Sequence, residues 1–168
     1  GKSLLILCSF LLAIAKTNLR QRVGYFGSEN GVFLEQDNSV VSAVLRSNVT
    51  GSVVDTKIAQ ANWNVDPLDG TGPSGVTLDL TKVQLMWLDF EWLGVGSVRF
   101  GFVMNGQFVP CHVFHHANEI NSTYITTASL PLRQELTNTG ATSGASQAKQ
   151  ICNSVICEGG YELRGRQQ

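Results

Sequence analysis

All three histidines of the chain lie within the segment Cys111–His116, which begins with a cysteine. Imidazole and thiolate groups are typical Zn²⁺ ligands. On an extended strand, however, His112 and His116 share one face about 13 Å apart, while His115 and Cys111 point to the other face. One metal ion cannot collect these ligands from a straight strand. We therefore expect structural histidines at a strand end, with zinc as the alternative if a bulge or turn brings the ligands together.

Asp89 and Glu91 form a second candidate for chemistry, because they stand two apart on one face of an expected strand, beside Trp87. Residues spaced in this way lie about 6–7 Å apart, a separation at which paired carboxylates act in some glycosidases. Sequence does not show that the two face a cleft. We expect instead that they lie on the solvent side and pair with Arg99 or Arg133. A glycoside hydrolase is the less favoured alternative.

Three aspartates, Asp66, Asp69 and Asp79, occur among the glycines of one turn-rich region. Loops of this kind can ligate Ca²⁺ through oxygen atoms, but the EF-hand pattern is absent and the spacing is loose. The chain also has no nucleophile-elbow, P-loop or dinucleotide-binding motif after a strand. We therefore predict no enzymatic activity, no metal and no cofactor, with calcium as an alternative.

Aromatic side chains that could stack on sugars are the remaining candidates. Trp87 and Trp92 stand among Leu, Met and Phe, which favours the core. Trp63 lies between two asparagines, which favours an exposed ring. We also expect loops at 48–52, 68–75 and 117–127 to form an end that faces outward or toward a partner. The predicted binding residues are Trp63, Asp69, Asn118 and Tyr124.

These residues are carried by short apolar segments separated by turn formers, which is typical of β-strands. Asn30-Gly31 and Asn105-Gly106 favour tight hairpins. Pro110 predicts an edge strand or a bulge, because proline cannot donate to the ladder. Both faces of 83–92 are largely apolar, as in a central strand. The expected strands are 20–26, 32–35, 40–45, 83–92, 97–104, 107–115 and 130–136, with a weaker segment at 57–63 and either a helix or a strand at 147–157.

This pattern predicts an all-β protein, an antiparallel β-sandwich of jelly-roll or concanavalin-like form with little helix. With 168 residues, the chain fits one domain that needs no disulfide or metal to fold. We expect Cys8, Cys111, Cys152 and Cys157 to be small buried residues with free thiols.

Charge is scarce and evenly balanced. Charged residues make up 15% of the chain and the net charge is −1, against a usual charged share of about a quarter. Because no basic run or stripe occurs, we expect no nucleic-acid partner. So little charge also predicts that part of the surface is covered by neighbouring subunits.

Residues 1–16 are strongly apolar and look like a secretory signal, with Lys2, an apolar run and a small-residue site at Ala13-Ile14-Ala15. The run is too short to cross a bilayer, so we expect no membrane partner. We interpret it as a strand or helix buried in the protein. Residues 17–162 then form the sandwich, and 163–168 lead to a further carboxyl-terminal part.

Five segments are together similar to a known group: 16–26, 68–75, 89–102, 115–118 and 130–140. They resemble poorly characterised virion structural proteins of aquatic bacteriophages and other large DNA viruses. The resemblance covers most of residues 16–162. It implies a component of the virus particle, assembled in the host cytoplasm, and transfers no catalytic residue.

We therefore expect a non-enzymatic virion structural domain, in the capsid decoration, tail or fibre, that contacts other virion proteins and copies of itself. The alternative is a carbohydrate-binding or adhesin module that recognises a host surface glycan.

Overall fold

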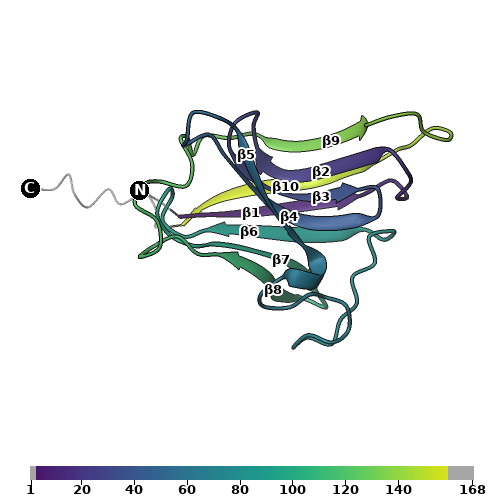
Figure 1. Ribbon diagram of the computed structural model, residues 1–168. Coiled ribbons are helices and arrows are strands. Elements are labelled where there is room, and N and C mark those ends of the chain that lie inside the picture. The colour runs from purple at the N-terminus through teal and green to yellow at the C-terminus, as the bar shows by residue number, and fades with distance from the viewer. Residues whose placement is uncertain (1–2, 159–168) are drawn as a thin grey trace, which may run out of the picture.

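The computed structural model describes residues 3–158 and is a sandwich of two antiparallel five-stranded sheets (Figure 1). Sheet A has the order β10-β1-β6-β7-β8, and sheet B has the order β5-β4-β3-β2-β9. The predicted all-β sandwich is thus confirmed. The strands are β1 (Ser3–Leu11), β2 (Leu19–Phe26), β3 (Gly31–Asp37), β4 (Val40–Ser47), β5 (Val54–Ala59), β6 (Gln84–Phe90), β7 (Val98–Met104), β8 (Gln107–Phe114), β9 (Leu132–Asn138) and β10 (Lys149–Glu158).

The amino-terminal apolar run is the second strand of sheet A. β1 pairs with β6 on one side and β10 on the other. Its residues alternate between buried and partly exposed positions, so Ile6 and Phe10 enter the core while Leu5 and Leu7 lie on the outer face. Because the side chains on both faces of β1 are apolar, some hydrophobic side chains lie on the outer face of the sheet.

The two hairpins predicted from Asn-Gly pairs are present. β7 and β8 are joined at Asn105 and Gly106, whose φ angles of 52° and 76° fit a tight turn. β2 and β3 form the other hairpin, and Gly31 begins β3. The ladder between β7 and β8 shifts register beside Pro110, which confirms the predicted bulge.

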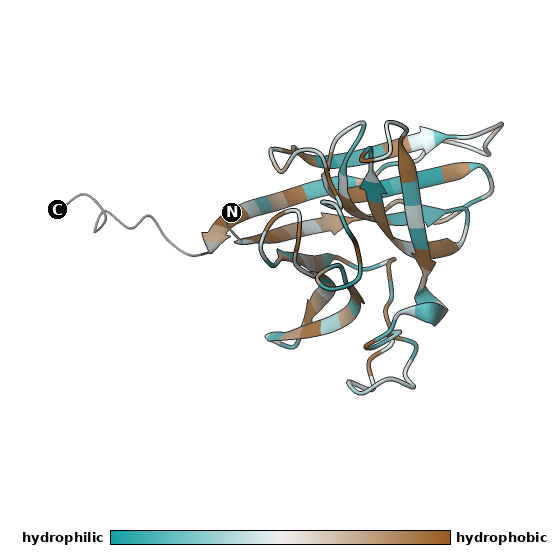
Figure 2. Ribbon diagram, turned by 60° about the vertical axis from the view of Figure 1, so that its left-hand side comes forward, coloured by the Kyte–Doolittle hydropathy of each residue, from teal (hydrophilic) through white to brown (hydrophobic). Residues whose placement is uncertain are grey.

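The core lies between the inner faces of the two sheets. Hydrophobic residues recur along the strands, alternating with polar ones in many places (Figure 2). The largest core side chains with almost no solvent exposure are Ile6, Phe10, Leu34, Met86, Leu88, Phe90, Phe100 and Phe102.

At three segments the structure either differs from the sequence prediction or decides between its alternatives. The weak segment at 57–63 is β5 followed by a 3₁₀ turn, Gln60–Asn62. The segment 147–157, for which the sequence allows a helix or a strand, largely belongs to the edge strand β10, Lys149–Glu158. β9 begins at Leu132 rather than at 130. Residues 159–162 of the expected domain and the expected linker at 163–168 lie outside the described residues.

Within residues 3–158, no helix has the length and hydrophobicity needed to cross a membrane.

Candidate binding surfaces

The four predicted binding residues lie on separate parts of the molecule and do not form one site. Trp63 follows the 3₁₀ turn after β5, and Asp69 belongs to the long β5–β6 connection. Asn118 and Tyr124 both lie in the β8–β9 connection, on the side of the sandwich where β8 ends.

The prediction that Trp63 is exposed is wrong. Its side chain is 5% exposed and packs edge-on against Phe100, with 5.1 Å between ring centroids. The indole Nε1–H donates to the carbonyl oxygen of Ile58 at 3.1 Å. Asn64, one of the polar neighbours that suggested exposure, bonds to β8 instead. Its side chain accepts from the backbone N–H of Val113 and donates to the carbonyl oxygen of Val113, both at 2.9 Å.

Asp69 is exposed, and its carboxylate accepts hydrogen bonds from the backbone and hydroxyl of Thr71. Asp66 is buried and accepts from the backbone N–H groups of Leu68 and Ser74, both at 2.9 Å. These carboxylates therefore hold their own loop in shape. Across the described part of the chain, no group of three or more His, Cys, Asp or Glu residues could hold a metal ion.

Tyr124 is also buried, so its ring does not present an exposed surface for a sugar, and its role in binding stays a prediction. Its ring stacks on His116 with 4.0 Å between centroids and 14° between planes. Burial raises the pKa of Tyr124 to about 12. Asn118 is exposed and has a φ of 65°. Its role in binding stays a prediction.

The histidines have structural positions, as expected. His116 lies 2.8 Å through Nδ1 from the carbonyl oxygen of Gly96. Nδ1 of His112 lies 3.2 Å from the backbone nitrogen of Asn64, which donates to it. Burial lowers the pKa of both imidazoles, which favours their neutral forms.

Asp89 pairs with Arg99 on the outer face of sheet A, which matches the expected ion pair. Glu91 lies beyond the end of β6, in the β6–β7 loop, and is exposed. Of the two carboxylates considered as a glycosidase pair, Asp89 is therefore bound to a cation, Arg99. Asp89 is almost completely buried, which leaves little room for a sugar beside it.

The cysteines divide into two kinds. Cys8 and Cys111 are buried, and burial raises the pKa of each thiol to about 12. Cys152 and Cys157 are exposed on β10, so the prediction that all four are buried is wrong for this strand.

The outer face of sheet A is largely apolar apart from the Asp89–Arg99 ion pair, and we call its hydrophobic side chains the apolar face. Its side chains point away from sheet B, because their neighbours along each strand belong to the core. Phe108 is 53% exposed and packs edge-on against Trp87, with 5.7 Å between centroids. The apolar face consists of Leu5, Leu7, Leu11, Leu85, Trp87, Val103, Phe108 and Ile156.

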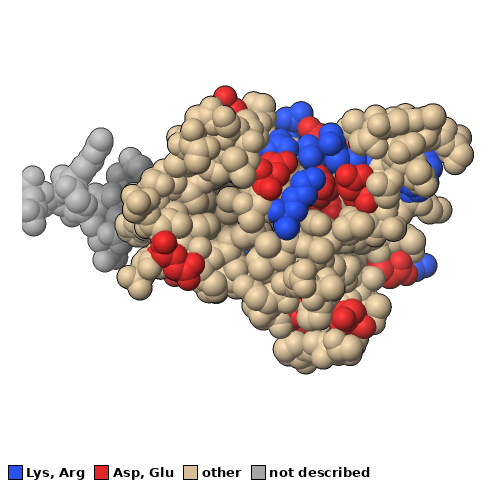
Figure 3. Space-filling view, viewed as in Figure 1, with Lys and Arg blue, Asp and Glu red and all other residues tan. Residues whose placement is uncertain are grey.

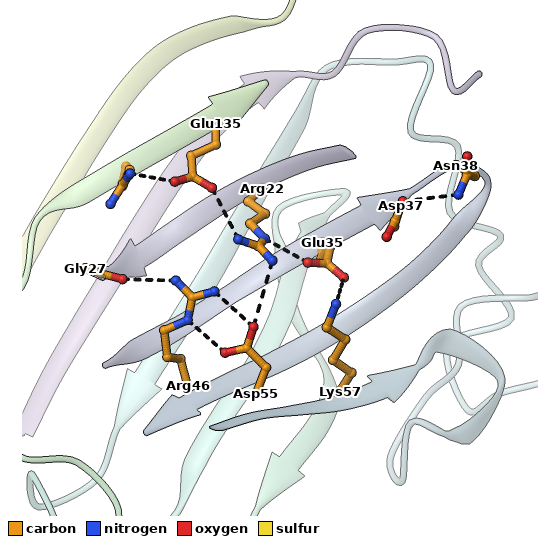
Figure 4. A network of polar contacts seen from close by, with 10 residues as sticks. Arg22, Gly27, Glu35, Asp37, Asn38, Arg46, Asp55, Lys57 and Glu135 are labelled. Carbon is orange, nitrogen blue, oxygen red and sulfur yellow. Dashed lines mark hydrogen bonds and ion pairs between the residues drawn. The ribbon is translucent and has the colours of Figure 1, made fainter. Parts of the chain in front are cut away.

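The outer face of sheet B has the opposite character. Lys, Arg, Asp and Glu gather there into a dense mixed patch, while most of the surface around it is uncharged (Figure 3). We call this patch the ionic network. It consists of Arg22, Glu35, Arg46, Asp55, Lys57, Arg133 and Glu135 (Figure 4).

Each carboxylate of the ionic network is bound by a cation of the same chain. Arg46 binds Asp55 with two hydrogen bonds, 2.8 and 2.9 Å long. Glu35 accepts from Arg22 at 2.7 Å and from Lys57 at 2.6 Å. Burial acts to raise the pKa of Asp55, but the hydrogen bonds and charge of Arg46, with the charge of Arg22, outweigh it and hold the pKa below its ordinary value.

Exposed hydrophobic residues also occur at the end of the sandwich where the β6–β7 and β8–β9 loops meet. The backbone N–H of Tyr124 donates to the carbonyl oxygen of Gly94 at 3.1 Å, which joins the two loops. Trp92, 58% exposed, lies here with Val95 and Ile120. The apolar neighbours of Trp92 predicted a core position, which is wrong because β6 ends at Phe90.

Comparisons with known proteins give little beyond the fold. No protein-family model matches the chain, and no curated protein matches it significantly. A solved structure of a tryptophan-to-alanine mutant of HCR/D is 10% identical, with a TM-score of 0.43 over 82% of this chain and 29% of that one. The binding domain of botulinum neurotoxin DC, solved in complex with SialylT, is 12% identical, with a TM-score of 0.40 over 92% of this chain and 29% of that one. The chain spans less than a third of either structure, and at these scores the likeness carries no functional argument.

Proposed function

We propose that this chain is a non-enzymatic binding module that attaches to other protein subunits through the apolar face. The observation that supports the proposal is the set of hydrophobic side chains that the strands of sheet A place on its outer face, beside the Asp89–Arg99 ion pair. Soluble monomers rarely expose contiguous apolar patches larger than a few hundred Å². Covering such surface stabilises a complex by about 25 cal/mol per Å² of apolar area removed from water.

The ionic network explains why sheet A, rather than sheet B, is the attached side. A partner that covered sheet B would remove the water around Arg133 and Lys57, whose side chains are 42% and 41% exposed. Removing water from ions carries an unfavourable free energy that their mutual attraction only partly offsets. The outer face of sheet A carries a smaller penalty of this kind, because among the described residues it holds one ion pair, Asp89 with Arg99, whose arginine side chain is 52% exposed. We therefore expect a partner with an uncharged, apolar surface.

We extend the proposal to a setting in a virus particle, where the partners are other virion proteins and further copies of this chain. The low share of charged residues and the resemblance of residues 16–162 to virion structural proteins support this setting. In a particle built from repeated subunits, each copy contacts a neighbouring subunit that can cover its apolar face.

The proposal is tested by comparing two exposed positions on opposite faces. Cysteine replaces either Phe108 on sheet A or Val40 on sheet B, which are 53% and 56% exposed. Cys152 and Cys157 are changed to serine in both variants, so that the new thiol is the reactive one. A bulky maleimide is then applied to each isolated variant chain and to the assembly into which that variant has been incorporated.

The proposal predicts that the cysteine at 108 reacts in the isolated chain and is protected at least tenfold in the assembly. The cysteine at 40 should react in both. Equal reactivity of the cysteine at 108 in the isolated chain and in the assembly would exclude attachment through the apolar face.

A second candidate function, glycan binding, is favoured by Trp92. Its exposed indole belongs to the β6–β7 loop, and a hydrogen bond joins this loop to the polar β8–β9 loop that carries Asn118 and Asn121. An exposed indole can stack on a sugar ring, and asparagine side chains can bond to its hydroxyls. A glycan array that includes sialylated glycans tests it. Binding that disappears in Trp92→Ala and persists in Phe108→Ala would support this function, and an array without hits would exclude it.

A further inference from the structure

β10 is an edge strand with one side open. It pairs with β1 from Lys149 to Glu158 with one register shift, at Ile151, and among residues 3–158 no strand pairs with its other side. At ten residues it is longer than any other described strand. An open strand edge presents a row of N–H and C=O groups that can pair with another strand.

The other edge of sheet A is covered. The backbone N–H groups of Val65 and Asp66 donate to the carbonyl oxygen of Cys111 on β8, at 3.0 and 3.1 Å. The side chain of Asn64 bonds both backbone groups of Val113. The chain before the long β5–β6 loop therefore occupies the position that a further strand would take.

Both edges of sheet B carry the features that protect a strand edge. β5 has only six residues and carries Asp55 and Lys57 on its outer face. β9 carries Arg133 and Glu135. Short length and charged side chains both oppose pairing with another strand.

β10 has no such protection in its central part. Residues 150–157 contain no charged side chain and no proline. Ile151, Val155 and Ile156 are all exposed. Val155 lies opposite Ile6 on the inner face and Ile156 opposite Leu5 on the outer face, so both faces of the strand are hydrophobic.

We propose that β10 pairs antiparallel with β10 of a second copy about a two-fold axis, which joins the two A sheets into one sheet of ten strands. A strand-to-strand contact needs two open edges, and among the described edge strands β10 is the one that is neither covered by another segment nor protected by charged side chains. A second copy supplies the same edge, and antiparallel pairing of identical strands gives a closed dimer. The proposal stands apart from attachment through the apolar face, which uses the outer surface of sheet A.

Asn153 marks the centre of the pairing. Its Oδ1 is buried and has no hydrogen-bond partner among the described residues. In an antiparallel pair centred on this residue, the two Asn153 side chains lie opposite each other, with Cβ atoms about 5 Å apart. Each amide can then donate to the unpartnered oxygen of the other. The same register brings Ile151 of each copy next to Val155 of the other.

Cross-linking tests this register. In a chain with Cys152→Ser and Cys157→Ser, Asn153→Cys should form a disulfide-linked dimer on mild oxidation with copper phenanthroline. Ser154→Cys and Val54→Cys, the latter on edge strand β5, should stay uncross-linked under the same conditions. A disulfide through position 154 in place of 153 would overturn the proposed register.

The molar mass tests the dimer itself. Multi-angle light scattering of the native chain should give twice the chain mass of 18.2 kDa. The measurement is made at about 100 μM, which exceeds the micromolar dissociation constants of weak interfaces. Val155→Lys should give a monomer with unchanged circular dichroism, because a lysine on an edge opposes pairing. Val54→Lys is the matched control, since the two valines are 47% and 50% exposed, and it should remain a dimer.

A native chain that is monomeric at this concentration would overturn the pairing, as would a Val155→Lys chain that remains dimeric. Neither result bears on the labelling of position 108 in the native assembly. Failure of the β10 dimer can therefore be distinguished from failure of attachment through the apolar face.

Discussion

Phe26 and Phe33 lie on the outer face of sheet B, yet neither side chain is exposed to solvent. Their rings pack together with 4.4 Å between centroids. The guanidinium groups of Arg22 and Arg46 lie over Phe33, and that of Arg133 lies over Phe26. The ionic network therefore both neutralises its own charges and covers two aromatic rings.

This arrangement predicts unequal effects for two arginines of the same network. Arg22→Ala should lower the free energy of unfolding by about 3 kcal/mol, because it leaves Glu35 with less compensation for its buried charge. Arg133→Ala should lower it by less than about 1 kcal/mol, because the arginine side chain of this ion pair is 42% exposed. Urea unfolding at pH 7 measures both. Equal losses would contradict the inference that Arg22 compensates more buried charge than Arg133.

The depressed pKa of Asp55 predicts a pH-dependent contribution to stability. Because the folded pKa is lower than the unfolded one, the unfolded state binds more protons between the two values. The contribution is present above the ordinary pKa of about 4 and is lost as the pH falls through the folded value. Asp55→Asn should therefore lower the urea midpoint at pH 7, and the difference from the native chain should shrink below about pH 4. A difference independent of pH would contradict this.

Residue-level prediction from the sequence was weakest for aromatic side chains. Trp63 has asparagines on both sides and is buried, while Trp92 has apolar neighbours and is exposed. Local composition does not predict that Asn64 bonds to β8, and it does not predict that β6 ends two residues before Trp92. Both facts depend on contacts between segments far apart in the chain.

At the scale of elements, hairpins could be predicted because their turn residues specify them locally. Asn105 and Gly106 adopt the positive φ angles that this pair favours. β10 could not be assigned in the same way. Its apolar residues fit either a helix or a strand, and its strand conformation depends on pairing with β1, more than 130 residues earlier in the chain.

The pairing of β6, β7 and β8 depends on a close approach at Gly101. A Cβ atom there would lie 2.7 Å from the indole of Trp87 and 2.2 Å from the carbonyl oxygen of Val109. Gly101→Ala should destabilise the protein by about 1–3 kcal/mol. It should also shift tryptophan fluorescence to longer wavelength, because the Trp87 indole, displaced from its hydrogen bond to the carbonyl oxygen of Phe102, becomes exposed to water.

Gly27→Ala is the control for that substitution, because the nearest atom to its Cβ lies 3.7 Å away. It should leave both the urea midpoint and the fluorescence nearly unchanged. A tolerated Gly101→Ala would show that β7 and β8 can separate without cost at this position.

At the scale of the whole molecule, the two outer faces differ in kind. Sheet B presents paired ions to solvent (Figures 3 and 4). Sheet A presents mainly hydrophobic side chains. The alternating pattern of the sequence predicted two rows of side chains in each strand. It did not predict which outer face would be charged, because that depends on which strands share a sheet.

The central claim is that the apolar face holds the chain in its assembly, and co-sedimentation with that assembly tests it most directly. The measurement compares Phe108→Lys with Val40→Lys, two substitutions of similarly exposed residues on opposite faces. The account predicts that Phe108→Lys reduces incorporation at least tenfold at an unchanged urea midpoint, while Val40→Lys incorporates like the native chain. Full incorporation of Phe108→Lys would contradict it.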